Sequence, residues 1–166
     1  MDNSNDKNMN IYRPEQDSIF LDADGLMYDD ISLTLIEKQD SSKRGDATFA
    51  YLFDVIADNI NVGGIHLRLG STLAYYYAGQ IGYWINESHQ KRGYATKACL
   101  ALLPLIKKHG FKRIVIGTDE NNMASQRVCE KVGMKLIEIV DTPEWSGLYE
   151  EGQRRTCIYE WTIENT

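Results

Sequence analysis

The chain has 166 residues, of which 43% are hydrophobic and 25% charged, and its formal net charge is −6. This length and composition are typical of one globular domain with a sizeable core. The acidic balance argues against broad nucleic-acid binding, which needs a basic face. The longest uninterrupted apolar run, Cys99 to Ile106, is too short to span a bilayer, so no membrane partner is expected.

The N-terminal segment has no chemistry that we can assign. Met1 to Asn10 is rich in Asn and Asp and lacks an apolar signal region. We therefore expect residues 1–12 to be a disordered lead-in and residues 13–166 to form a single domain. The three cysteines are an odd number without metal-ligand spacing, which predicts reduced thiols, a cytoplasmic location and no metal site.

Alternating apolar and polar residues predict three strands in the first half of the chain. They are expected at Asp30–Lys38, Thr48–Ala57 and Asn61–Leu69. The polar stretch from Gln39 to Asp46 is typical of a turn or loop. Tyr75, Tyr76 and Tyr77 are expected to lead into the next strand, Gly79–Ile85.

A helix is predicted from Ala95 to Lys108 because apolar residues recur there at helical spacing, and His109-Gly110 is typical of a helix end. Pro104 lies inside this pattern, where it removes one backbone hydrogen bond, so we expect the helix to continue with a kink. The remaining expected elements are a strand at Lys112–Thr118, a helix at Met123–Val132, a strand at Lys135–Val140, a loop at Thr142–Gln153 and a strand at Arg154–Ile163.

The turn Gln90-Lys91-Arg92-Gly93-Tyr94-Ala95 is the strongest chemical signal. It leads directly into a predicted helix, whose first N–H groups have no helical partner and lie at the positive end of the macrodipole. An anion placed there receives several hydrogen bonds at once, and a diphosphate suits the site. Gly93 leaves room for phosphates beside the backbone. In isolation, the same residues would form an ordinary loop with a solvated Lys-Arg pair.

Three motifs in order make the signal specific. The turn above has the pattern Gln-x-x-Gly-x-Ala, Asn122-Met123-Ala124-Ser125 has the pattern Asn-x-x-Ser, and residues 130–134 read Glu-Lys-Val-Gly-Met. With the predicted strands and helices between them, residues 79–140 resemble the acetyl-CoA core of the GNAT acetyltransferases, most closely the RimJ/RimL-like branch. The resemblance implies an α+β GNAT fold, with a mixed, mostly antiparallel seven-stranded sheet flanked by helices.

The resemblance also implies an activity and a cosubstrate. The expected reaction is direct transfer of the acetyl group of acetyl-CoA to a primary amine, without a metal. Lys91, Arg92 and Lys97 are expected to cluster at the coenzyme phosphates, and the Ile85 N–H to face the thioester oxygen. The residues expected to contact acetyl-CoA are Tyr83, Trp84, Ile85, Gln90, Lys91, Arg92, Gly93, Tyr94, Ala95, Thr96, Asn122 and Ser125.

The catalytic groups are less well specified. Many GNAT enzymes have a Tyr seven residues after the Asn, and here that position is Cys129. We therefore predict Ser125 as the donor to the leaving thiolate; the alternatives are that it only caps a helix, or that Cys129 or water donates. Asn122 is expected to bond the pantetheine arm, to cap the helix, or both. Glu87 is the predicted base, with His89, His66 and water as alternatives.

The sequence does not decide whether the acceptor amine belongs to a small molecule or to a protein N-terminus. GNAT domains usually have two helices after the first strand, and Gln39 to Asp46 is too short for them, so either that lid is missing or Arg13–Tyr28 replaces it. An aromatic and acidic loop with Trp145, Tyr149, Glu150 and Glu151 would favour an ammonium group.

The alternative function is a non-catalytic acyl-CoA-binding or sensing module. Exposed strand edges would allow a homodimer.

Overall fold

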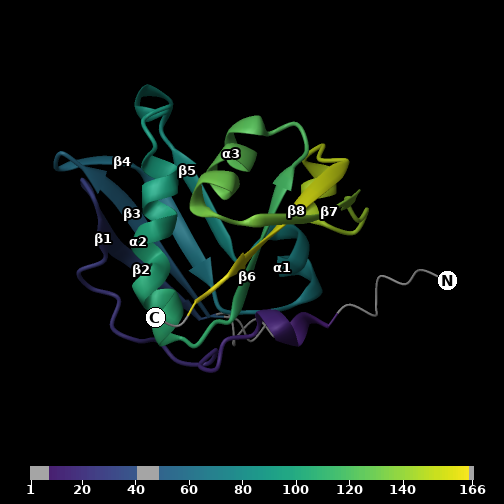
Figure 1. The fold of residues 1–166 in the computed structure, drawn as a ribbon, viewed down its shortest axis with the longest axis horizontal. Coiled ribbons are helices and arrows are strands. Elements are labelled where there is room, and N and C mark those ends of the chain that lie inside the picture. The colour runs from purple at the N-terminus through teal and green to yellow at the C-terminus, as the bar shows by residue number, and fades with distance from the viewer. Residues whose placement is uncertain (1–7, 41–48, 165–166) are drawn as a thin grey trace.

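Figure 1 shows the computed structural model of the chain, which describes residues 8–40 and 49–164. Its strands are antiparallel neighbours in two sheets, and helices cover them. The strands are β1 (Met27–Tyr28), β2 (Ile31–Asp40), β3 (Phe49–Ala57), β4 (Ile60–Arg68), β5 (Ile81–Ile85), β6 (Arg113–Asp119), β7 (Lys135–Asp141) and β8 (Arg155–Thr162). The α-helices are α1 (Leu73–Ala78), α2 (Tyr94–Lys108), α3 (Met123–Val132) and α4 (Gly147–Glu150), and the 3-10 turns are η2 (Met9–Tyr12) and η4 (Glu87–His89).

The expected single sheet is divided in two. One sheet has the order β1-β2-β3-β4-β5 and the other β6-β8-β7, and every pairing within the described residues is antiparallel. The seven expected strands are all present, and β1 is an additional two-residue strand that the sequence pattern did not reveal. The break falls between β5 and β6, which α2 connects along the chain.

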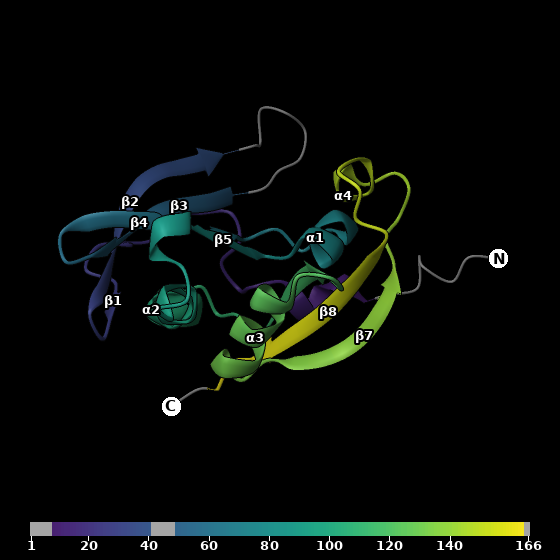
Figure 2. The same cartoon turned by 90° about the horizontal axis from the view of Figure 1, so that it is seen from above.

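The core lies between α2 and one face of the five-stranded sheet (Figure 2). Alternation along the strands directs Phe53 of β3, its partner Ile65 of β4 and the next partner Tyr83 of β5 to this face. From α2, Ala98, Leu102 and other residues at helical spacing are fully buried against them.

Helix α2 continues through Pro104 to Lys108, as predicted. It is the longest helix among the described residues, and none of these helices is both long and apolar enough to cross a membrane.

The chain is ordered earlier than predicted. Residues 1–7 lie outside the described residues, but Met9–Tyr12 form η2, and the Tyr12 side chain is only 3% exposed. Its hydroxyl donates a 2.8 Å hydrogen bond to Glu160 Oε2 of β8, so Met9–Tyr12 are structured within the segment that was expected to be disordered. Burial of an aromatic ring orders this segment, although its polar neighbours suggested disorder.

The segment from Arg13 to Tyr28, the alternative to a missing lid, begins beside helix α2. It packs at the C-terminal end of α2, where the Gln16 N–H donates to the His109 carbonyl at 3.0 Å and Glu15 lies against Gly110. Most of the loop predicted at Gln39 to Asp46 lies outside the described residues.

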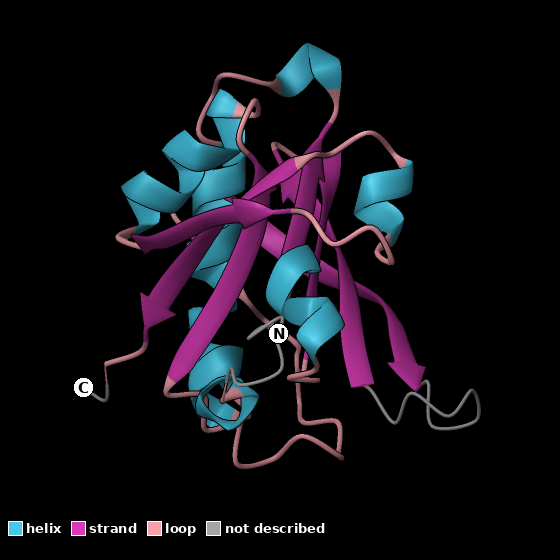
Figure 3. Ribbon diagram, turned by 90° about the vertical axis from the view of Figure 1, so that its right-hand side faces the viewer, coloured by secondary structure: helices cyan, strands magenta, loops and turns pink. Residues whose placement is uncertain are grey.

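Two short helices interrupt stretches that were expected to be irregular or extended (Figure 3). Helix α1 contains Tyr76 and Tyr77, which are buried against Val115 and Ile158, and Thr72 Oγ1 caps its N-terminus. Helix α4 lies within the expected loop and is capped by Ser146 Oγ. Both are too short to show a helical period, and Tyr favours strands, so the sequence pattern concealed them.

Candidate functional site

Gln80 joins the two sheets just before they separate. Its backbone N–H donates to the Val115 carbonyl at 2.8 Å, and its side-chain oxygen accepts from the Val115 N–H at 3.1 Å. Its side-chain nitrogen donates to the carbonyls of Tyr12 and Gly70, so this fully buried amide has its hydrogen-bond partners. Beyond this anchor the described residues of β5 and β6 form no ladder. The strands therefore diverge and leave a cleft.

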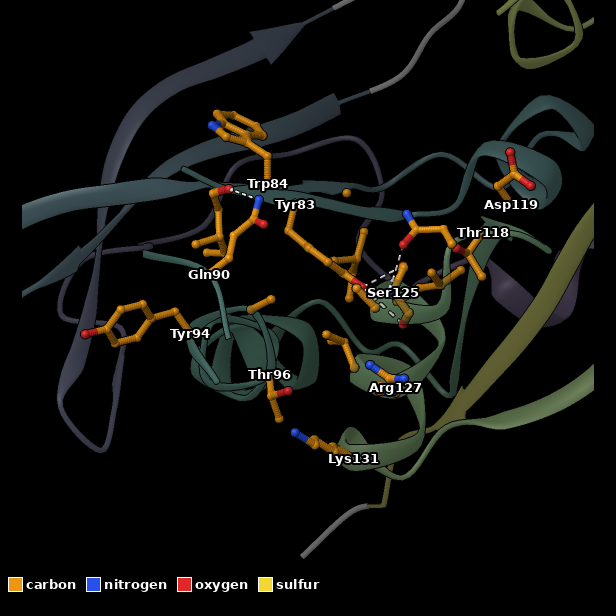
Figure 4. A pocket seen from close by; sticks show the side chains of 18 of the residues that line it. Tyr83, Trp84, Gln90, Tyr94, Thr96, Thr118, Asp119, Ser125, Arg127 and Lys131 are labelled. Atoms are coloured by element: carbon orange, nitrogen blue, oxygen red, sulfur yellow. Dashed lines mark hydrogen bonds between the residues drawn. The ribbon is translucent and has the colours of Figure 1, made fainter. Parts of the chain in front are cut away.

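The cleft has a volume of about 790 Å³ and lies between β5, β6, the N-terminal end of α2 and the length of α3. Figure 4 shows side chains from all four elements around it. Of the residues predicted to contact the cosubstrate, all but Arg92 line it: Tyr83, Trp84, Ile85, Gln90, Lys91, Gly93, Tyr94, Ala95, Thr96, Asn122 and Ser125.

Gly93 begins α2 in a conformation that favours glycine. Its φ is 79°, and it lacks a side chain to cap the helix, so the first N–H groups of α2 have no capping side chain. A Cβ at Gly93 would meet no atom within 4 Å, so within the protein the constraint is the backbone angle and not space. The side-chain amide of Gln90 donates a 2.9 Å hydrogen bond to the Ile85 carbonyl and links this turn to the end of β5. The turn thus presents backbone donors to the cleft.

A hydrogen-bonded group spans the cleft from β5 to α3. The Asn122 side-chain oxygen accepts from the Ser125 N–H at 3.1 Å, so Asn122 caps α3. Tyr83, from β5, brings its hydroxyl to 2.8 Å from Ser125 Oγ. Burial raises the pKa of the Tyr83 phenol well above its usual range, so this hydroxyl stays protonated. The group therefore presents neutral hydroxyls to the cleft.

Two cations on α3 were missed by the sequence analysis. Arg127 and Lys131 line the cleft one turn apart, and the Lys131 side chain points toward Thr96 near the start of α2 (Figure 4). Their spacing of four residues was the available signal. Lys97, in contrast, does not join Lys91 as predicted: its ammonium contacts Asp29 at 2.9 Å and Asp30 at 2.6 Å on the β1–β2 turn. The positive charge of the cleft therefore comes partly from α3.

Three residues that were predicted or considered for the site do not line the cleft. Glu87 is exposed on η4 and is not among the cleft residues, whereas the nearby His89 is. Arg92, which was predicted to contact the cosubstrate, lies within the turn and is exposed. Cys129 is fully buried, and burial raises the pKa of its thiol to about 12, which makes it a poor proton donor.

His66 lies on the sheet face opposite α2, across the ladder from Gly82. Its Nε2 is buried without a hydrogen-bond partner. Burial, with a smaller effect of Arg68, lowers the pKa of the imidazole to about 4, so the ring is neutral at pH 7.

The aromatic and acidic loop before β8 contributes only Gln153 to the cleft wall. Trp145 is 61% exposed, with its ring 6.0 Å from that of Tyr77. The Tyr149 ring lies 3.8 Å from the Arg154 guanidinium, which already occupies its face. Within residues 8–40 and 49–164, no three His, Cys, Asp or Glu side chains are grouped so that they could hold a metal ion.

The family follows from a match over most of the chain. The acetyltransferase (GNAT) domain family matches residues 25–135, and the chain belongs to this family. The resemblance and the GNAT fold expected from the sequence are therefore confirmed, with the sheet divided as described above.

Individual relatives are more distant. The uncharacterized N-acetyltransferase YnaD of Bacillus subtilis (strain 168) is 34% identical over 76 residues, which are 40% of this chain and 42% of YnaD. The chain thus matches less than half of that relative. RimL, a ribosomal L7/L12 alpha-N-protein acetyltransferase solved in complex with coenzyme A, has a TM-score of 0.56 at 22% identity, covering 74% of this chain and 66% of RimL.

A further solved structure is the Salmonella typhimurium acetyltransferase that modifies the N-terminal serine of ribosomal protein L7/L12. It has a TM-score of 0.55 at 23% identity, covering 75% of this chain and 68% of the neighbour. At this level of identity, RimL and the Salmonella enzyme show a common fold.

Proposed function

We propose that this protein is an N-acetyltransferase that moves the acetyl group of acetyl-CoA to a primary amine by direct attack. The observation that carries the proposal is the cleft between β5 and β6, which combines uncapped helix N–H groups at Gly93 with the Tyr83–Ser125 hydroxyls. Membership of the GNAT family and the coenzyme A complex of a structural neighbour support it.

The donors of the cleft suit the chemistry of acetyl-CoA. The start of α2 would hold the diphosphate, because backbone N–H groups and the helix dipole favour an anion there. Lys91, Arg127 and Lys131 add positive charge for the phosphates. The diverging edge of β5 would pair with the amides of the pantetheine arm, with the Ile85 N–H toward the thioester oxygen.

Ser125 is the proposed donor to the leaving thiolate. It lies on the cleft wall at the start of α3, whereas Cys129 is fully buried one turn further along. Glu87, the base predicted from the sequence, is exposed and outside the cleft wall, so the geometry favours His89 or water as the acceptor of the amine proton. The three buried, unpaired cysteines support a cytoplasmic location.

Calorimetric titration of the purified protein with acetyl-CoA tests the cosubstrate. We expect saturable binding at one site. Thiol release is then measured with a panel of amines: a peptide with a free N-terminal serine, as suggested by the Salmonella neighbour, free amino acids, spermidine and an aminoglycoside. An amine that releases coenzyme A identifies the acceptor class. Failure of a folded protein to bind acetyl-CoA would overturn the proposal.

Ser125→Ala separates catalysis from binding. We expect it to reduce turnover about 100-fold while the affinity for acetyl-CoA is kept, because the hydroxyl acts on the leaving group only during transfer. Binding of acetyl-CoA without thiol release with any amine would instead support the acyl-CoA-binding or sensing module. The position of Glu87, the predicted base, outside the cleft wall favours this alternative.

A further inference from the structure

Tyr83 and Ser125 bring two hydroxyl groups together from different parts of the chain. The Tyr83 hydroxyl lies 2.8 Å from Ser125 Oγ and 3.4 Å from the Ser125 carbonyl oxygen. Tyr83 lies on β5 and Ser125 at the start of α3, so the contact links two elements that line the cleft (Figure 4). The contact holds the serine side chain in the first turn of α3.

We propose that Tyr83 is a positioning residue for acetyl transfer: it donates its hydroxyl proton to Ser125 Oγ and so directs the serine proton toward the leaving sulfur. The inference rests on the proposed acetyltransferase function and on Ser125 as its thiolate donor. It assigns Tyr83 a role beyond contact with the cosubstrate, which was its predicted function.

The direction of this hydrogen bond decides whether Ser125 can act. A serine hydroxyl has one proton and two acceptor lone pairs. If Ser125 donated to Tyr83, its proton would be engaged, and the Tyr83 proton would be left with the Ser125 carbonyl at 3.4 Å, a long hydrogen bond. If Tyr83 donates at 2.8 Å, the serine proton is free to point into the cleft.

Burial keeps the Tyr83 hydroxyl protonated, so it remains a hydrogen-bond donor. Because burial disfavours the phenolate, the pKa of Tyr83 lies well above its usual range, and the hydroxyl keeps its proton through the reaction. Asn122 fixes the other side of the serine by accepting from its backbone N–H at 3.1 Å. Ser125 is thus held at its backbone by α3 and at its oxygen by β5.

The proton balance of the step is complete without a further reactant. The neutral amine attacks the thioester carbon, a C–N bond forms, and the nitrogen becomes positively charged. As the C–S bond breaks, the serine proton passes to the sulfur, and the proton on nitrogen passes through His89 or water to Ser125 Oγ. The products are the amide and the free thiol. Tyr83 keeps its own proton and occupies one lone pair of Ser125 Oγ, which leaves the other for the amine proton.

Four variants test the pair: Tyr83→Phe, Ser125→Ala, their combination, and Tyr28→Phe as a control. Tyr83→Phe removes the hydroxyl and keeps the half-buried ring, and Tyr28 is a 45% exposed tyrosine away from the cleft. Turnover is measured with the amine identified by the panel above, and the Kd for acetyl-CoA by calorimetry. We expect Tyr83→Phe to lower kcat about 10-fold or more at unchanged Kd. The double variant should be no slower than Ser125→Ala, because the two residues act as one unit.

The selenoester analogue of acetyl-CoA supplies a readout that a purely structural role would not change. A selenol is a stronger acid than a thiol, so it leaves without needing a proton. The losses caused by Tyr83→Phe and Ser125→Ala should both shrink with this donor, whereas a misplaced substrate would remain slow with either donor.

The outcomes separate this inference from the proposed function. If no amine releases coenzyme A from the wild-type protein, the proposed function fails, and the inference fails with it. If the wild-type protein turns over and Tyr83→Phe stays within twofold of it, or the two losses multiply in the double variant, only the role of Tyr83 is overturned. Equal losses with the thioester and the selenoester would overturn it as well.

Discussion

The His66 imidazole occupies the space in which a side chain at Gly82 would begin. The two residues are partners across the β4–β5 ladder, and a Cβ built on Gly82 would lie 2.2 Å from His66 Nε2. The φ of Gly82 lies outside the left-handed region, so its backbone conformation does not require a glycine. The requirement comes from the neighbouring imidazole of His66.

Gly82→Ala should therefore destabilise the fold by about 1–3 kcal/mol, since the ring must move out of a packed position. Urea denaturation of the variant measures the loss. Gly147→Ala is the control, because a Cβ there meets nothing within 4 Å. Adding His66→Ala to Gly82→Ala should recover part of the loss. If Gly82→Ala is as stable as the wild-type protein, the imidazole is not confined to this space.

His66 should also make stability depend on pH. Its pKa is 6.5 when unfolded and about 4 in the folded protein, so the unfolded state binds more protons between these values. The contribution of His66 to the free energy of unfolding is fully present above pH 6.5. It falls by about 2–3 kcal/mol as the pH drops toward 4. Burial also lowers the pKa of His109, which adds a similar dependence of its own.

His66→Leu tests this dependence, because it keeps an apolar group of similar volume and removes the unpartnered nitrogen. We expect the variant to be at least as stable as the wild-type protein at pH 7 and to lose less stability at pH 5. Urea denaturation at the two pH values provides the comparison. An unchanged loss between pH 7 and pH 5 would assign the dependence to other groups, His109 first.

Arg127 and Lys131 should contribute to acetyl-CoA affinity by charge. Reversal of either charge to Glu is expected to raise the Kd roughly 3- to 10-fold at low salt, with a smaller effect at high salt, because exposed charges are screened. Lys108→Glu is a matched control, since Lys108 is exposed at the far end of α2. Equal effects of Lys108→Glu and Lys131→Glu would indicate that only net charge matters.

Gly93 and Gly133 allow backbone strain to be separated from binding. Both have positive φ, 79° and 99°, and a Cβ at either would meet no atom within 4 Å. Alanine at either position should cost about 1 kcal/mol of stability. Only Gly93→Ala and Gly93→Glu should weaken acetyl-CoA binding, the latter severely, because a carboxylate would stand beside the phosphates. Calorimetry on the three variants decides, and normal binding by Gly93→Glu would exclude this turn as the phosphate site.

Local sequence determined most of the elements and the family. The seven expected strands and the two long helices follow from hydrophobic periodicity, which is set by residues close together in the chain. Helix α2 runs through Pro104 because the apolar pattern on both sides of it packs against the same sheet. The turn at residues 90–95 and the cap at Asn122 are likewise local features, so their motifs could be identified from the sequence.

Contacts between distant residues were decided by the tertiary structure alone. Gln80 and Val115 set where the sheets separate, Tyr12 is ordered by Glu160, and Lys97 is drawn away from the cleft by Asp29 and Asp30. The Tyr83–Ser125 pair belongs to the same class. No periodic pattern records such pairings, because each depends on how whole strands and helices pack. The sequence therefore indicated an anion site and a family, and packing decided which side chains meet in the cleft.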